Sequence, residues 1–254
     1  MSEPENLIQA AGTSYEAWLG SQRLAAVPAI SLHTLAPPGQ RVVIVAPHPD
    51  DEVIACGGLL AALADRPQDL VLISITDGEG SHPDSPEWPP ERLRRVREDE
   101  SAQALRALGL APESLTWHRL HAPDSRVGED ETGLITRLRA LLRPGDRVFT
   151  TWRLDGHCDH EAAARACLDA AADTGAQVLE IPVWAWHWAA PEDDRLPWDR
   201  AHRLLLTPQW LERKRAALQA HQSQLHPDPT TGAAPVLSEE ALRRWLQPFE
   251  VVFL

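Results

Sequence analysis

The sequence lacks several features that would place it in a membrane or in an oxidising compartment. It has no apolar run near the ~18–20 residues of a membrane-spanning helix, so we expect no membrane span. Its start, MSEPENLIQ, has neither the basic nor the apolar segment of a secretory signal. The three cysteines, Cys56, Cys158 and Cys167, form no disulfide framework and no CxxC pair. Because such cysteine usage suits a reducing environment, we expect a cytoplasmic location.

Positive charge is also scarce. The chain has 24 Lys and Arg against 37 Asp and Glu, a formal net charge of −13. This balance disfavours binding to nucleic acid or to anionic lipid through bulk electrostatics. Neither a Walker A motif nor a G-x-G-x-x-G fingerprint follows the first predicted strand, which removes the main support for a nucleotide-dependent transferase. The sequence leaves a homo-oligomer open.

Apolar segments alternate between strand and helix patterns through most of the 254 residues. This order predicts a single α/β domain over residues 41–254, with a mainly parallel sheet and helices on both faces. Residues 1–40 are expected to form an N-terminal arm or a lead-in helix over Ser14 to Ala26. The predicted strands are Arg41–Ala46, Leu70–Ile75, Val148–Thr151, Val178–Trp184 and Val251–Leu254. The predicted helices are Gly57–Leu63, Glu91–Leu108, Leu134–Leu142, Glu161–Ala172, Pro208–Gln222 and Ser238–Trp245.

The first cluster of chemically active residues follows the first predicted strand directly, as Pro47-His48-Pro49-Asp50-Asp51-Glu52. Ligands of open parallel sheets gather at this edge, beyond the carboxyl ends of the strands. A purely structural alternative is a solvated turn in which Asp50 or Asp51 caps the next helix. That alternative explains neither the imidazole nor the two stiffening prolines.

The second cluster, Asp155-Gly156-His157-Cys158-Asp159-His160-Glu161, also lies between a predicted strand and a predicted helix. One edge of the sheet can therefore bring the two clusters together although they are far apart in the sequence. One histidine from each cluster and one aspartate make a two-histidine, one-carboxylate set. Such a set can hold Zn(II), and Fe(II) is chemically compatible with it.

The two clusters resemble the signature motifs of the PIG-L / LmbE-like family of zinc-dependent N-deacetylases. Weaker similarities extend from about residue 41 to about residue 225. They are Thr76-Asp77-Gly78-Glu79, Arg97 to Glu100, Asp124, and Lys214 with Ser223-Gln224. The resemblance implies a Rossmann-like fold, a catalytic zinc and removal of an N-acetyl group from an N-acetylglucosamine-type conjugate, with zinc-bound water as the nucleophile.

The resemblance also implies individual roles. His48, Asp51 and His160 are expected as metal ligands, and Asp50 as the general base. His157 is expected to stabilise the oxyanion and, if protonated, to donate to the leaving amine, unless it is a structural histidine beside the ligands. Asp159 is expected to orient His157 or to raise its pKa.

Two residues are expected to bind the substrate. The resemblance places Arg97 at the sugar hydroxyls, whereas its spacing from Glu100 also suits a surface ion pair on a helix. Asp124 is expected to accept hydrogen bonds from vicinal hydroxyls, unless it is simply a turn former.

Some features depart from the family pattern. Cys158 stands where the family usually has Pro, and we expect a small buried side chain that points away from its neighbours. Asp155 stands where some relatives have an oxyanion-assisting Tyr. Trp184, Trp186 and Trp188 alternate, which in a strand places them on one face as a sugar platform, a core or an interface. Two other functions remain: a non-catalytic metal-containing sugar-binding module, and an amidase acting on a non-sugar amide.

Overall fold

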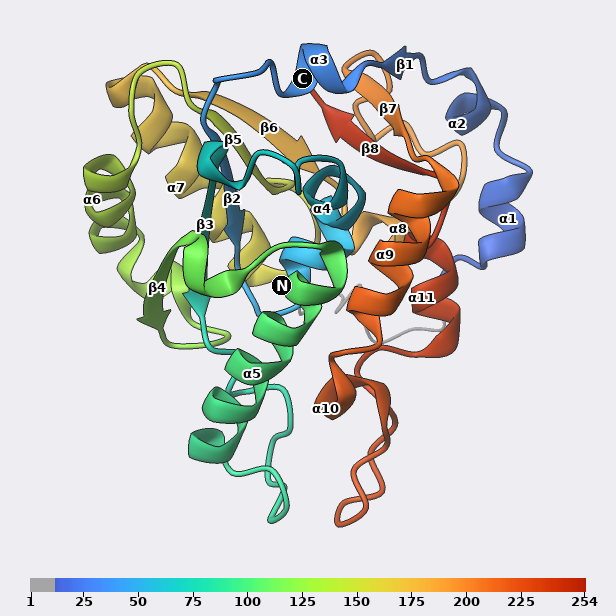
Figure 1. Ribbon diagram of the computed structural model, residues 1–254. Helices are drawn as coiled ribbons and strands as arrows, with labels where there is room; N and C mark the ends of the chain where they lie inside the picture. Colours follow the sequence, from blue (N-terminus) through green and yellow to red (C-terminus); the bar gives the residue numbers. More distant parts are fainter. Residues whose placement is uncertain (1–11) are drawn as a thin grey trace, which may run out of the picture.

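The computed structural model describes residues 12–254, which form a three-layer α/β fold (Figure 1). Its eight-stranded sheet has the order β1-β7-β8-β6-β5-β2-β3-β4, and only β8 runs antiparallel to its neighbours. The strands are β1 Ala29–Ile30, β2 Val42–Ala46, β3 Leu70–Thr76, β4 Thr116–Ala122, β5 Arg147–Thr151, β6 Gln177–Ile181, β7 Ala201–Leu205 and β8 Phe249–Phe253. The mainly parallel sheet predicted from the sequence is confirmed.

Helices cover both faces of the sheet because its central strands are apolar on both sides. In β2, Val42 and Ile44 join the core beneath α4, α5 and α9, whereas Val43 and Val45 join the core beneath α6 and α7. The helices are α1 Tyr15–Leu19, α2 Gln22–Ala26, α3 Leu32–Leu35, α4 Asp51–Ala62, α5 Pro90–Leu108, α6 Glu131–Leu141, α7 Cys158–Thr174, α8 Ala185–Trp188, α9 Pro208–Leu218, α10 Gln222–Leu225 and α11 Glu239–Trp245.

The connectivity of the sheet fixes where a ligand can bind. From β2 the chain runs outward through β3 and β4, and it then returns to the other side of β2 to form β5 and β6. The strand order therefore reverses between β2 and β5, which is the usual ligand position in doubly wound sheets. The two clusters predicted from the sequence follow these two strands.

Three strands were not predicted from the sequence. β4 and β7 have polar residues between their apolar ones, and β4 lies at an edge of the sheet, so neither has the apolar run that identifies the central strands. β1 has two residues and pairs with β7 at the other side of the sheet.

The helix predicted over Ser14 to Ala26 is two short helices, α1 and α2, because the chain turns at Gly20 and Ser21. Trp18 and Leu24 are buried in the same core as the central sheet. The part of the predicted arm that the structure describes is thus packed against the domain. Residues 1–11 lie outside the described residues.

A buried ion pair holds α4, the helix that begins at Asp51, against α9 and β8. Lys214 Nζ donates to Glu250 Oε1 at 2.7 Å and to the Ile54 carbonyl at 2.8 Å. Glu250 also accepts the backbone N–H groups of Gly58 and Leu59 at 2.7 and 2.9 Å. Each charged group is therefore paired, as its burial requires.

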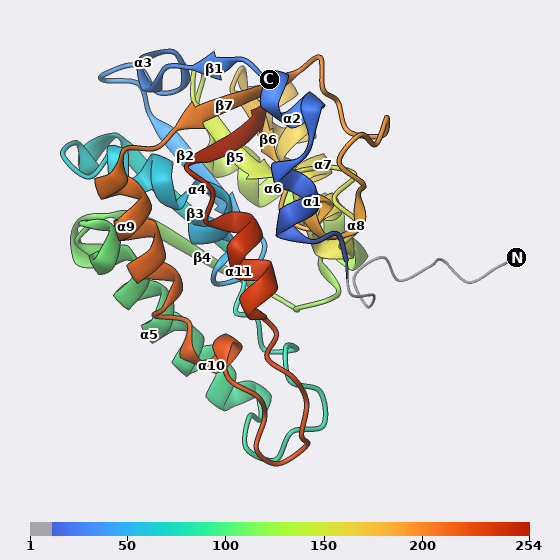
Figure 2. The same ribbon diagram turned by 90° about the vertical axis from the view of Figure 1, so that its right-hand side faces the viewer.

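Two long loops extend from the same end of the molecule and lie side by side. They are the segment between β3 and α5 and the segment between α10 and α11 (Figure 2). Ser85 Oγ and Thr230 Oγ1 connect them at 3.4 Å. Within residues 12–254, no helix is long and apolar enough to cross a membrane.

Lys214→Met should lower the free energy of unfolding by about 3–5 kcal/mol, because it leaves the buried Glu250 carboxylate without its cation. Urea unfolding followed by tryptophan fluorescence measures the change. Arg215→Met is the matched control, since Arg215 is exposed and pairs with Glu212 at 3.5 Å, and it should change stability by about 0.5 kcal/mol or less. Equal midpoints for the two variants would contradict the role given to Lys214.

Candidate metal centre

Three side chains from the two clusters converge at the reversal point of the sheet. His48 follows β2, Asp51 begins α4, and His160 lies in the first turn of α7. Asp51 Oδ2 is 3.1 Å from His48 Nδ1 and 3.2 Å from His160 Nε2. This arrangement brings two imidazole nitrogens and one carboxylate oxygen to one point. It is the set that the sequence predicts as metal ligands.

The atoms of His48, Asp51 and His160 that face one another suit a bound cation. His160 Nε2 is buried and has no hydrogen-bond partner. Burial lowers the pKa of His160, but Asp51 and Asp155 outweigh it and raise the pKa to about 9. A positive charge is thus favoured between His160 and Asp51. A divalent ion meets the same demand, and imidazole nitrogen with carboxylate oxygen is a donor set that Zn²⁺ accepts.

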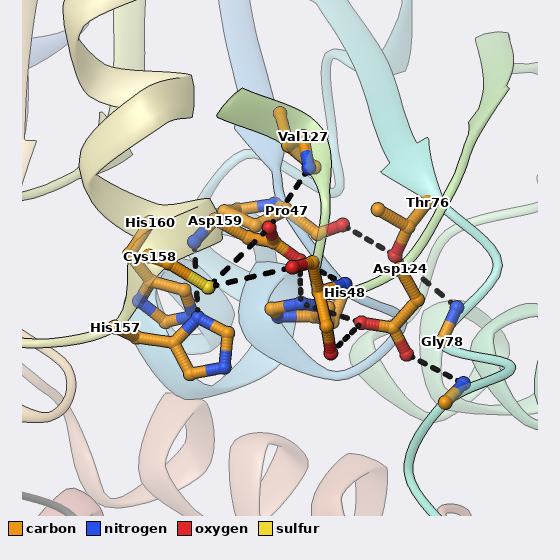
Figure 3. A network of polar contacts seen from close by, with 12 residues as sticks. Pro47, His48, Thr76, Gly78, Asp124, Val127, His157, Cys158, Asp159 and His160 are labelled. Carbon is orange, nitrogen blue, oxygen red and sulfur yellow. Dashed lines mark hydrogen bonds and ion pairs between the residues drawn. The ribbon is translucent and has the colours of Figure 1, made fainter. Parts of the chain in front are cut away.

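In each of the two imidazoles, the ring nitrogen that does not face Asp51 contacts a carboxylate. His48 Nε2 lies 3.0 Å from Asp159 Oδ2 and 3.3 Å from Asp124 Oδ1, as Figure 3 shows. His160 Nδ1 lies 2.8 Å from Asp155 Oδ2. Such contacts fix the tautomer and the orientation of a ligating imidazole.

Asp155 is a site residue whose role the sequence does not reveal. It is fully buried, and its carboxylate also accepts the backbone N–H groups of Val183, Trp184 and Ala185. By capturing three successive N–H groups it holds the chain in a turn after β6. The expectation that the tryptophans alternate along a strand is therefore wrong, because β6 ends at Ile181 and Ala185–Trp188 is helical.

The three tryptophans of this segment have separate surroundings. Trp184 lies parallel to the His157 ring, with 6.5 Å between centroids. Trp186 packs edge-on against Trp18, and Trp188 stacks on Trp152. Only Trp184 lines the pocket described below.

Asp50 has a constrained backbone next to the ligand set. Its φ of 126° is unusual for a residue other than glycine and costs about 1–3 kcal/mol. Its N–H donates to Glu52 Oε2 at 3.0 Å, and its Oδ2 accepts from Arg97 Nη2 at 3.0 Å. Burial raises the pKa of the Asp50 carboxyl to about 7, while Arg97 opposes the rise.

His157 lies beside both ligand histidines, and its ring is 4.8 Å from each. Burial lowers the pKa of His157 to about 3, and the neighbouring His160 and His48 add to this effect. Its Nδ1 accepts the Asp159 N–H at 3.2 Å, so the proton of the neutral ring is on Nε2.

Asp159 differs from the expectation that its carboxylate orients His157. That carboxylate instead contacts His48 and accepts the N–H groups of Ser125 at 2.7 Å and Val127 at 3.0 Å (Figure 3). Asp159 does act to raise the pKa of His157, but burial, His160 and His48 outweigh it, so the pKa is lowered. Cys158 is exposed rather than buried, with Sγ 3.8 Å from the Ser125 carbonyl oxygen. The first turn of α7 thus places Asp159 inward and Cys158 outward.

The two residues predicted to bind the substrate, Arg97 and Asp124, make hydrogen bonds mainly within the protein. Arg97 is buried, and its Nη atoms donate to the Gly78 carbonyl, the Pro49 carbonyl and Asp50. The surface ion pair that its spacing from Glu100 also suited is therefore excluded. Asp124 Oδ2 accepts the Gly80 N–H at 2.8 Å.

One pocket of about 220 Å³ joins these residues. Every predicted site residue except the fully buried Asp159 lines it. One part of the wall is apolar and includes Trp184, Trp245 and Leu237, and another is polar and includes Ser81 and Gln224.

Other donor sets in the same region are less suited to one ion. In the described residues, three sets have ligand atoms within 4.8 Å of one another: His48, His157 and His160; His48, Asp124 and Asp159; and His157, Cys158 and Asp159. The first set has no carboxylate. The other two depend on Asp159, whose oxygens already accept two backbone N–H groups.

Asp155→Asn should weaken metal binding by about 10- to 100-fold, because it removes the carboxylate that holds His160 Nδ1. Titration of the metal-free protein with Zn²⁺ against a competing chelator measures the affinity. Asp169→Asn, an exposed change on α7, is the control and should leave it unaltered. An unchanged affinity in Asp155→Asn would refute the orienting role.

Comparison with known proteins identifies the family and the fold. The chain is 31% identical over 121 residues to the 1D-myo-inositol 2-acetamido-2-deoxy-alpha-D-glucopyranoside deacetylase of Kineococcus radiotolerans, covering 46% of this chain and 32% of that protein. It is 33% identical over 145 residues to the 2'-N-acetylparomamine deacetylase of Streptomyces fradiae, covering 53% and 43% of the two chains. The matches therefore span less than half of either relative.

The fold is similar to that of the N,N'-diacetylchitobiose deacetylase from Pyrococcus horikoshii. The TM-score is 0.58 at 20% identity, over 76% of this chain and 74% of that one. The family model described as "PIG-L: GlcNAc-PI de-N-acetylase" matches residues 43–171, which include both clusters. The chain belongs to the PIG-L family.

Proposed function

We propose that this protein is a metal-dependent hydrolase that removes the N-acetyl group from an amino-sugar conjugate of the N-acetylglucosamine type. The observation that carries the proposal is the convergence of His48, Asp51 and His160 beside Asp50 in one pocket. A sugar-binding module has no need of Asp50, a buried acid with a strained backbone next to the proposed metal site. The named activities of the two relatives, both deacetylases of amino-sugar compounds, support the same reaction.

The metal proposed for the site is Zn(II), held by His48, Asp51 and His160, and Fe(II) is compatible with the same donors. When bound, such an ion acts as a Lewis acid toward water and toward an amide carbonyl. Asp159 and Asp155 orient the two imidazoles from behind, through contacts of 3.0 and 2.8 Å.

Asp50 is proposed as the general base that takes the proton from the attacking water. Arg97 donates to both Asp50 Oδ2 and the Pro49 carbonyl, so it fixes the side chain and the backbone of this residue together. Its Nε is buried and has no hydrogen-bond partner. We therefore assign Arg97 first to positioning Asp50, and then to the substrate.

His157 is proposed to donate a hydrogen bond from Nε2 to the developing oxyanion. The Asp159 N–H fixes this tautomer by occupying Nδ1. Asp124 shapes the substrate side of the pocket by holding Gly80. Trp184 and Trp245 offer aromatic surface to the apolar face of a sugar ring.

The substrate is proposed to be a small molecule, because the site opens into a pocket of about 220 Å³. A cytoplasmic setting agrees with cysteines that are all free in the described chain. Release of free amine from a panel of N-acetylglucosamine conjugates, with Zn(II) and Fe(II) supplied separately, tests the reaction and the metal. No release from any conjugate with either metal would refute the proposal.

Asp50→Asn should reduce turnover by about 10²- to 10⁴-fold, because it removes the proton acceptor but keeps the size of the side chain. Metal content should be unchanged, as measured by elemental analysis. Asp51→Asn is the paired variant and should lose metal first, with activity falling as a result. If Asp50→Asn lost its metal while Asp51→Asn kept it, the two roles would be exchanged.

Arg97→Lys should lower kcat by about 10-fold or more with a smaller change in KM, because an ammonium cannot reproduce the fork that holds Asp50. Steady-state kinetics on a conjugate hydrolysed by the unaltered protein gives both constants. Arg94→Lys, one turn earlier on α5, is the control, since Arg94 is exposed and pairs only with Glu79. A rise in KM at constant kcat would assign Arg97 to the substrate alone.

A further inference from the structure

Gln224, on α10, is a polar residue of the pocket that the proposed mechanism does not use. It is fully buried and lines the same pocket as Asp50 and Arg97. Its Oε1 is buried and has no hydrogen-bond partner. A buried carbonyl without a donor costs about 1–3 kcal/mol, so such a group inside a pocket points to a ligand.

The direction of the Gln224 amide follows from the groups around it. Ser223 Oγ lies 2.7 Å from Glu100 Oε2, and the Ser223 N–H lies 2.6 Å from Glu100 Oε1. An ionised carboxylate only accepts, so the Ser223 hydroxyl gives its single proton to Glu100. The same hydroxyl must therefore accept from Gln224, at 2.9 Å, and this assigns the amide nitrogen to that side.

Both N–H groups of the amide have partners within the protein. One is directed to Ser223 Oγ, and the other approaches Ser81 Oγ at 3.4 Å. The oxygen is thus left as a fixed acceptor. Asp124, the acceptor predicted from the sequence, is in contrast engaged with Gly80 and His48.

We infer that Gln224 Oε1 accepts a hydrogen bond from a ring hydroxyl of the substrate and so determines which amino sugars are hydrolysed. This inference rests on the proposed function and names a specificity residue within it. The side-chain hydrogen bonds of Gln224 are to Ser81 and Ser223, and none of the three proposed metal ligands is among these partners.

If Gln224 has this role, α5 positions two groups of the site. Arg97 on this helix fixes Asp50, and Glu100, one turn later, fixes Ser223 and through it Gln224. One rigid helix therefore sets the position of the base relative to that of the sugar acceptor.

The test compares a conjugate that the unaltered protein hydrolyses with its 3-, 4- and 6-deoxy analogues. For the unaltered protein, kcat/KM should be about 10-fold lower on the one analogue that lacks the hydroxyl bound by Gln224 than on the parent conjugate. Gln224→Met should lose about 10-fold on the parent conjugate, mainly through KM, with no further loss on that analogue. Gln222→Met changes the exposed glutamine two residues earlier on α10; it is the matched control and should behave as the unaltered protein.

Melting temperature and bound metal are measured for each variant, and Ser223→Ala covers the case in which Gln224→Met does not fold. Ser223→Ala removes the hydroxyl that accepts from the Gln224 amide but keeps Gln224 itself. It should therefore reduce the same difference in kcat/KM between the conjugate and the analogue. Equal losses on the parent and on every analogue, or no loss at all, would refute the role of Gln224 and leave the deacetylase proposal intact. Failure of the unaltered protein to hydrolyse or bind any conjugate would refute both.

Discussion

The candidate site depends on a carboxylate placed between two imidazoles. Asp51 Oδ2 lies 3.1 Å from one ring nitrogen and 3.2 Å from the other, inside the protein. Without a cation, the unprotonated His160 Nε2 and the carboxylate would repel each other, since both are acceptors. The surrounding structure can be understood as what holds these three groups together.

Part of that support comes from the sheet. β2 and β5 are neighbours although two strands, β3 and β4, and three helices, α4, α5 and α6, lie between them in the chain. The reversal of the strand order leaves room between the loops that follow them. Further support comes from carboxylates behind the ligands. Asp155 orients His160 and also ends β6, so one side chain couples the metal site to the turn that carries Trp184.

The C-terminal third of the chain completes the pocket rather than the ligand set. Trp245, Leu237 and Gln224 line the pocket, and all of them follow α9. The family model ends at residue 171, within α7. These pocket residues thus lie outside the segment that the family model matches, whereas His48, Asp51 and His160 lie inside it.

The sequence by itself determined the alternation of strands and helices, because apolar periodicity is a local property. It also placed two clusters of possible metal-binding residues after two of the predicted strands, and the family resemblance selected His48, Asp51 and His160 among them. The tertiary structure decided everything that depends on a partner distant in the chain. It directs Asp159 to His48, Arg97 to Asp50, and Asp155 to both His160 and the turn after β6. No local pattern of residues encodes those contacts. They arise because the crossover connections bring the ends of separate strands together, where each buried charge must find a partner.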